Sequence, residues 1–354
     1  MATNQAPPPS YASTLRRDLS RMLKKNHRNE LPEVSLEDVL QEKTCSPISL
    51  QDFKWFLKNR EHTLENLDFY YWYLDYRERF RSLSDLEKAK SPMPREKARP
   101  AASHTVTMDS AIGFGNENEE RTAEELSSQN VDQTGTLGSD FQPYRDEINA
   151  VLKTFFDDSS FKELNLEQSL KKYVKYHACR TTHPEVFAEV FEHINWVLGH
   201  SSLPNFLHNA ILNIRSGWVA IYYVSAFVHI IHVPMILYMT YTGHMSRLFR
   251  LPILFFAFGG ISSFFTARIG FCTFRGLFKR RQIPLYELDD IQAARVSTEK
   301  YTRTNGAQNV THLTTILDPN VRKHNIEMIC HLMLFSLILA ICITIPGLVI
   351  TNEP

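Results

Sequence analysis

The sequence predicts an all-α protein in which a helical, water-facing part precedes three transmembrane helices. Three observations predict this fold class. Nearly all the long apolar runs lie after residue 215. Apolar residues recur at helical spacing through residues 34–80 and 143–198. No segment alternates apolar and polar residues as a half-buried strand does.

Charge balance, cysteine spacing and the N-terminal sequence argue against several classes of protein. The 354 residues carry 39 Lys+Arg and 39 Asp+Glu, so the formal charge is zero. This balance argues against a nucleic-acid partner, which would favour a basic excess. The five cysteines form no CxxC pair, which argues against a disulfide scaffold and a zinc ribbon. Since the N-terminus lacks the apolar core of a secretory signal, membrane insertion is expected to use an internal segment.

Residues 1–33 are expected to be a disordered tail followed by a basic amphipathic helix. The first thirteen residues are rich in proline. Residues 14–28 place Leu15, Leu19 and Leu23 on one face, surrounded by Arg and Lys. Such a helix fits a membrane surface, and packing on the following domain fits equally well.

The water-facing domain is predicted over residues 34–212. Ser35 is expected to begin its first helix and Thr63 to cap a helix dense in aromatic residues. Residues 82–140 are rich in Ser, Glu, Asn, Gly and Pro, so we expect a disordered insertion within this domain. Helical pattern then returns over 143–156, 165–176 and 184–198.

Three uncharged or nearly uncharged runs predict transmembrane helices over 216–241, 251–274 and 328–350. Each is long enough for a bilayer core of about 30 Å, although the second is uncharged only over its first 17 residues, 251–267. Arg and Lys concentrate before the first run, after the second and before the third. The domain and loop 275–326 are therefore expected in the cytosol and the C-terminus outside. Asn309 begins a glycosylation sequon that disagrees with this orientation.

Motifs for catalysis or cofactor binding are absent, so we expect neither an enzyme nor a cofactor site. His177, Cys179 and His183 are too loosely spaced for a metal site. Histidines 229, 232 and 331 lie inside apolar runs, where we favour hydrogen bonds between helices over a proton relay. Cys272 is read as an apolar cysteine, with acylation as the alternative.

Residues 46–74 read SPISLQDFKWFLKNREHTLENLDFYYWYL, with Phe53, Phe56 and Leu57 followed by Glu65-Asn66-Leu67-Asp68-Phe69. Further on lie the turn Glu163-Leu164-Asn165-Leu166-Glu167, then Phe187 and Phe191, then the run 201–207. Together these motifs resemble a regulator of G-protein signalling (RGS) domain over about 34–212, interrupted by the insertion.

The resemblance implies a helical bundle that binds Gα in its GTP-bound or transition state and accelerates GTP hydrolysis. Such a domain supplies no nucleophile, because catalysis in Gα consists of positioning. The resemblance gives these Gα-binding positions: Glu65, Asn66, Asn165, Glu167, Ser201, Ser202 and Asn205. The chain departs from the family where Ser201 and Asn205 replace an Asp and an Arg, so a charge-assisted contact is lost.

An RGS domain followed by three spans resembles fungal, Rax-type membrane proteins of bipolar bud-site selection. That resemblance implies a plasma-membrane location, contact with membrane lipids, a second integral membrane protein as partner and a role in cell polarity. Two other functions stay open. One is a non-catalytic scaffold whose RGS surface only binds proteins, and the other is a small oligomeric channel that uses the intramembrane histidines.

Overall fold

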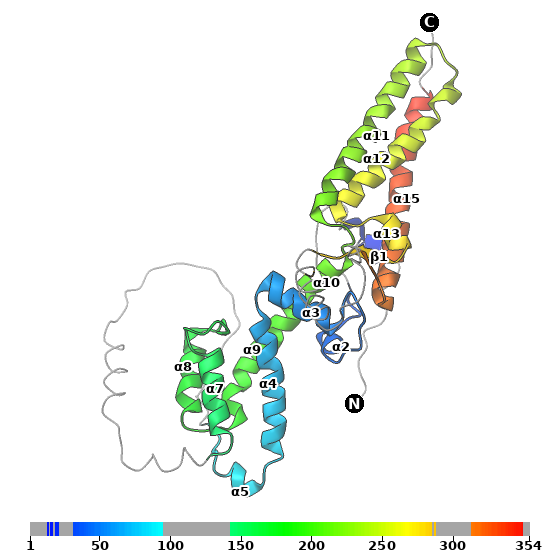
Figure 1. Ribbon diagram of the computed structural model, residues 1–354. Coiled ribbons are helices and arrows are strands. Elements are labelled where there is room, and N and C mark those ends of the chain that lie inside the picture. The colour runs from blue at the N-terminus through cyan, green and yellow to red at the C-terminus, as the bar shows by residue number, and fades with distance from the viewer. Residues whose placement is uncertain are drawn as a thin grey trace, which may run out of the picture. The chain divides into compact units, whose positions relative to one another are not determined.

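The structure, a computed structural model, describes residues 13, 15–16, 18–20, 31–94, 142–284, 287 and 313–349 (Figure 1). It divides into two compact units, one of residues 65–195 and one that combines residues 1–64 with 196–354. Helices dominate both, and the described residues contain a single pair of short strands. The predicted all-α fold class is confirmed.

The unit of residues 65–195 is a helical bundle around aromatic side chains. Its elements are α4 (Leu64–Arg81), α5 (Asp85–Lys88), α7 (Arg145–Phe155), α8 (Gln168–Ala178), the 3-10 helix η2 (Pro184–Phe187) and α9 (Ala188–Val197). The buried Phe69 ring lies 5.6 Å from Phe155 and 6.4 Å from Phe187. Tyr73 lies 4.7 Å from Phe191. The aromatic run of α4 therefore forms the centre of this core, as its density predicts.

The start of the predicted insertion is folded. Residues 82–94 follow α4, with Ser84 capping α5. The buried Ser91 hydroxyl lies 2.6 Å from that of Thr182. Thr181 donates a hydrogen bond of 2.7 Å to the carbonyl of Pro92. The remainder of the predicted insertion, residues 95–140, lies outside the described residues.

The second unit begins with α2 (Leu36–Leu40), α3 (Leu50–Phe56) and the π-helix η1 (Leu57–Glu61), and resumes with the π-helix η3 (Leu198–Ser202) and α10 (Leu203–Ile211). Ser35 caps α2, as predicted, in a capping box with Asp38. Phe206 packs 5.0 Å from Phe53 and thereby joins α10 to α3. Thr63 differs from its predicted capping role, because its buried hydroxyl has no hydrogen-bond partner among the described residues.

Three long apolar helices follow: α11 (Ser216–Thr242), α12 (Pro252–Ile269) and α15 (Pro319–Val349). All three are long and apolar enough to cross a membrane, and they run side by side (Figure 1). α12 ends five residues before the predicted end at 274, because Gly270 adopts φ 76° and stops the helix. α15 starts at Pro319, ahead of the predicted residue 328.

The connections between these helices contain short elements that the sequence pattern does not predict. The 3-10 helix η4 (Arg247–Arg250) joins α11 to α12, and α13 (Thr273–Leu277) follows α12. β1 (Arg280–Gln282) pairs antiparallel with β2 (Leu313–Thr315) inside the loop expected at 275–326. Asn309 lies outside the described residues.

Within the second unit, the segment around α2 and α3 is bonded directly to the end of the three-helix module. Asp318 accepts a 3.2 Å hydrogen bond from the backbone N–H of Cys45. The carbonyl of Ser46 accepts one of 2.8 Å from Leu317. Arg281 is buried and lies 2.9 Å from Glu287 and 3.8 Å from Asp52 of α3.

The N-terminal helix packs on the three-helix module. Residues 18–20 are helical, and Leu19 packs against the apolar core of α12 and α15. Asp18 is buried, with its Oδ2 atom 2.6 Å from Nδ1 of His331. The two alternatives predicted for this helix are a membrane surface and the following domain, and packing on the three-helix module is not among them.

Two of the three histidines in the apolar runs, His229 and His232, differ from the prediction of hydrogen bonds between helices, whereas His331 agrees with it through its contact with Asp18. Nδ1 of His229 lies 2.8 Å from the carbonyl of Ser225, and Nδ1 of His232 lies 2.6 Å from that of Val228. Both carbonyls lie one turn earlier in the same helix. Each of these two imidazoles therefore has its Nδ1 atom hydrogen-bonded within its own helix.

Candidate functional site

The loop between α7 and α8, residues 156–167, has a defined path. The backbone N–H of Leu164 donates a 2.9 Å hydrogen bond back to the carbonyl of Phe155, at the end of α7. The Leu164 side chain is fully buried. Because Asn165 comes next, this anchor fixes where the Asn165 backbone leaves the core.

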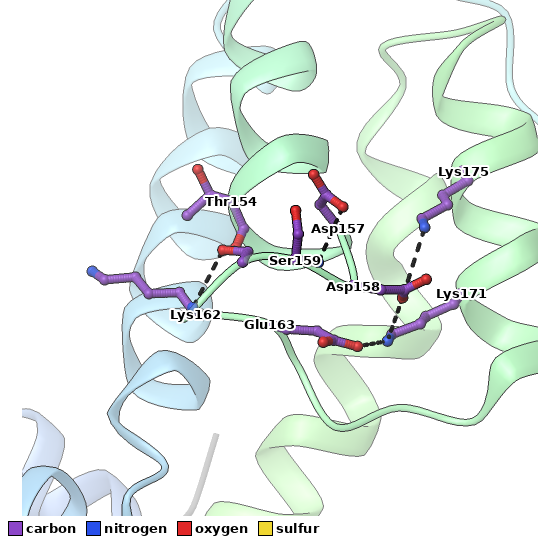
Figure 2. Close-up of polar contacts among 9 residues, drawn as sticks. Thr154, Asp157, Asp158, Ser159, Lys162, Glu163, Lys171 and Lys175 are labelled. Carbon is purple, nitrogen blue, oxygen red and sulfur yellow. Dashed lines mark hydrogen bonds and ion pairs between the residues drawn. The ribbon is translucent and has the colours of Figure 1, made fainter.

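A lysine from α8 holds the loop from the other side. Figure 2 shows Lys171 reaching two loop carboxylates. Its Nζ atom lies 3.3 Å from Asp158 Oδ1 and makes a short contact with Glu163, while the Lys171 side chain is only 7% exposed. The hydrogen bond that Lys171 donates to the Glu163 carboxylate raises the pKa of Lys171. Lys175 is 44% exposed and lies 4.0 Å from Asp158, so its contact is weaker.

The same loop is tied to the first turns of α4. Lys162 Nζ lies 2.8 Å from Asp68 Oδ2. The rings of Phe69 and Phe156 lie 6.1 Å apart. The structure thus brings the loop and the start of α4, which carries Glu65 and Asn66, to one end of this unit.

Four of the predicted site residues lie at this end. Asn165 and Glu167 are exposed, and Glu65 and Asn66 are half-buried. Glu167 accepts a 2.7 Å hydrogen bond from the Ser169 hydroxyl. The start of α4 and the α7–α8 loop therefore each contribute one amide and one carboxylate.

The other three predicted residues belong to the second unit. Ser201 is exposed, whereas Ser202 is only 2% exposed at the end of η3. The Asn205 side chain is exposed, and its Nδ2 atom donates a 3.0 Å hydrogen bond to Oε1 of Glu61. The amide that replaces the family's arginine is therefore engaged within its own unit.

Residues 122–213 match the family model of the Regulator of G protein signaling domain. The chain carries an RGS domain. This match covers the α7–α8 loop with Asn165 and Glu167, and the stretch with Ser201, Ser202 and Asn205. It does not reach the predicted first half of the domain at 34–80, which remains an expectation. No curated protein and no solved structure matches the chain.

Outside these elements, the described residues offer little for other chemistry. No group of three or more His, Cys, Asp or Glu side chains among them is placed to hold a metal ion. His183 caps η2 by accepting from the N–H of Glu185, and burial lowers its pKa. Cys272 is buried, and its Sγ atom accepts a 3.0 Å hydrogen bond from Tyr222.

Sequence reasoning missed the residues that shape the loop of the RGS domain. Lys171 is the main one, and Asp158 and Glu163 are its partners. An available signal was the pair of lysines one turn apart on α8, which follows a loop with several carboxylates. Phe161, 93% exposed on the same loop, was also missed.

Proposed function

We propose that this chain is a membrane-anchored regulator of heterotrimeric G-protein signalling that binds activated Gα and accelerates GTP hydrolysis. The RGS-domain match that covers the α7–α8 loop supports this proposal most directly. The three apolar helices support the anchoring. The protein itself performs no chemical step.

In this proposal, Asn165 contacts the switch loops of Gα from a restrained backbone. Its uncharged amide can donate and accept hydrogen bonds without repelling phosphate. Holding the switch loops near their transition-state geometry accelerates hydrolysis that Gα performs with its own residues. The restraints from Leu164 and Lys171 reduce the ordering that this contact requires. Phe161 adds exposed aromatic surface for the contact.

Single-turnover GTP hydrolysis tests the proposal. The full chain in liposomes is added to a panel of Gα subunits loaded with GTP. We expect at least one Gα to be accelerated, and Asn165→Ala or Asn66→Ala to reduce that acceleration about tenfold or more. The matched control is Asn195→Ala, since Asn195 is an exposed amide on α9.

Two results would count against the assignment. One is a folded chain that accelerates no Gα of the panel. The other is full acceleration by both Asn66→Ala and Asn165→Ala.

The alternative is a scaffold whose RGS surface binds a protein without accelerating hydrolysis. The Asn205–Glu61 hydrogen bond favours it, because the donor that replaces an arginine already has a partner. Binding of Gα without acceleration, unchanged in Asn165→Ala, would support this alternative.

We further propose that the RGS domain faces the cytosol, that the C-terminus lies outside, and that the membrane is the plasma membrane. The asymmetry of Lys and Arg around the spans supports this orientation. We also propose a polarity-landmark role with a second integral membrane protein as partner. Localisation of a tagged chain in dividing fungal cells, combined with protease protection of the tag, tests these assignments.

A further inference from the structure

We propose that α13 and the two basic residues after it form a binding site for acidic phospholipid headgroups. α13 leaves α12 after the turn at Gly270 and lies beside α15 (Figure 1). Its position is fixed by close packing at Gly276. A Cβ atom added there would lie 2.6 Å from Phe271 Cζ and 3.1 Å from Ile329 Cδ1. This face of α13 therefore packs closely against Phe271 and against Ile329 of α15.

The fixed packing leaves three large apolar side chains outside the core. Phe274 is 72% exposed, Leu277 is 64% exposed and Phe278 is 68% exposed. Ile329, which touches the inner face, lies at the start of the uncharged run of α15. The helix that carries these exposed side chains therefore packs where the uncharged run of α15 begins. Exposed apolar side chains at this position fit insertion between lipid headgroups.

Cations flank this apolar surface. Lys279 and Arg280 follow directly and are exposed, and neither side chain has an ion-pair partner among the described residues. The Arg275 guanidinium lies 5.2 Å from the centre of the Trp218 ring. Trp218 stands in the first turn of α11, where aromatic residues mark a membrane–water boundary.

Exposed apolar side chains next to cations that have no ion-pair partner in the described part of the chain fit lipids that carry negative charge. A zwitterionic headgroup offers no net charge to Lys279 and Arg280, whereas an acidic phospholipid does. Acidic lipids concentrate in the cytoplasmic leaflet, which agrees with the orientation proposed above. This site is independent of any contact with Gα.

Lipid-dependent thermal unfolding of the full chain tests the site. The chain in neutral detergent micelles is titrated with phosphatidylserine or with phosphatidylcholine. We expect phosphatidylserine to raise the unfolding temperature at lower lipid concentration, because a ligand that binds the folded state stabilises it. About 1 M salt should weaken the difference, since it shortens the screening length to about 3 Å.

The double variant Lys279→Gln/Arg280→Gln should lose about 25-fold in apparent affinity for phosphatidylserine, roughly fivefold for each cation. Arg247→Gln is the matched control, because Arg247 is exposed in η4, in the other connection of the module. Phe274→Ser/Phe278→Ser should weaken the response to both lipids.

Three results would overturn the proposal. The first is an equal response to the two lipids. The second is an unchanged response in the Lys279→Gln/Arg280→Gln variant. The third is an equal stabilisation by inorganic phosphate without lipid, which would indicate binding of a soluble anion.

Discussion

Lys171→Met offers a direct test of how the α7–α8 loop is held. The substitution keeps an unbranched chain but removes the charge that Asp158 and Glu163 share. Glu163 is 32% exposed and Asp158 is 67% exposed, so water replaces part of the lost interaction. We therefore expect a local cost of about 2 kcal/mol, within the usual range for hydrogen bonds to charged groups.

Hydrogen exchange at the Leu164 amide measures this cost. That amide bonds to the Phe155 carbonyl and exchanges only when the loop opens. A cost of about 2 kcal/mol corresponds to roughly thirtyfold faster exchange. Lys175→Met is the matched control, with an expected change below about 0.5 kcal/mol because its contact is long and exposed.

The reasoning fails if Lys171→Met leaves exchange at Leu164 within about twofold of the native rate. It also fails if Lys175→Met accelerates exchange as much. In either case, the buried backbone and not the lysine would hold the loop.

Three further substitutions have expected outcomes. Arg281→Met should lower stability by about 3–5 kcal/mol, because it removes a buried guanidinium that lies 2.9 Å from the buried Glu287 and 3.8 Å from the buried Asp52. The exposed Arg280→Met should change stability by less than about 0.5 kcal/mol, and thermal unfolding distinguishes the two variants. Arg250→Met should lower the free energy of unfolding by about 2 kcal/mol or more, because the buried guanidinium donates hydrogen bonds of 3.1 Å to Thr240 and 3.0 Å to the carbonyl of Gly347. Arg247→Met should have little effect in the same thermal-unfolding assay. The hydrogen bond that Arg79 donates to Glu147 lowers the pKa of the Glu147 carboxyl group. The stability that the ionised Glu147 contributes is therefore fully present above the ordinary glutamate pKa and is lost as the pH falls through the lowered pKa. Glu147→Gln should make the free energy of unfolding less dependent on pH on the acid side.

The fold class was predictable because it depends on features that one stretch of sequence contains. Uncharged runs of membrane length appear as α11, α12 and α15. Their ends were less predictable where the apolar pattern continues past a helix. Residues 269–274 are almost entirely apolar, yet Gly270 ends α12 by its left-handed conformation. Gly259 and Gly260 lie inside the same helix without ending it. A glycine in an apolar run therefore does not by itself indicate where a helix ends.

For the candidate site, the sequence alone names only the residues that stand in a motif of the RGS family. Asn165 stands in a recognisable turn, whereas Lys171 acts through a loop whose path the sequence does not specify. The bond between Asp18 and His331 joins residues 313 positions apart. Such pairs depend on the complete fold, and local patterns carry no sign of them.

The hydrogen bonds and ion pairs between the α2–α3 segment and the three-helix module affect the order in which the protein can fold during synthesis. Cys45 finds its partner Asp318 only after 273 further residues have been synthesised. The α2–α3 segment therefore emerges from the ribosome long before the groups that complete it, and its contacts form only after α15 has been synthesised. A chain cut after α10 would also leave Asp52 without Arg281. We therefore expect that a fragment of residues 34–212 is less stable without the three-helix module, and that nonsense mutations ahead of α15 destabilise the α2–α3 segment as well.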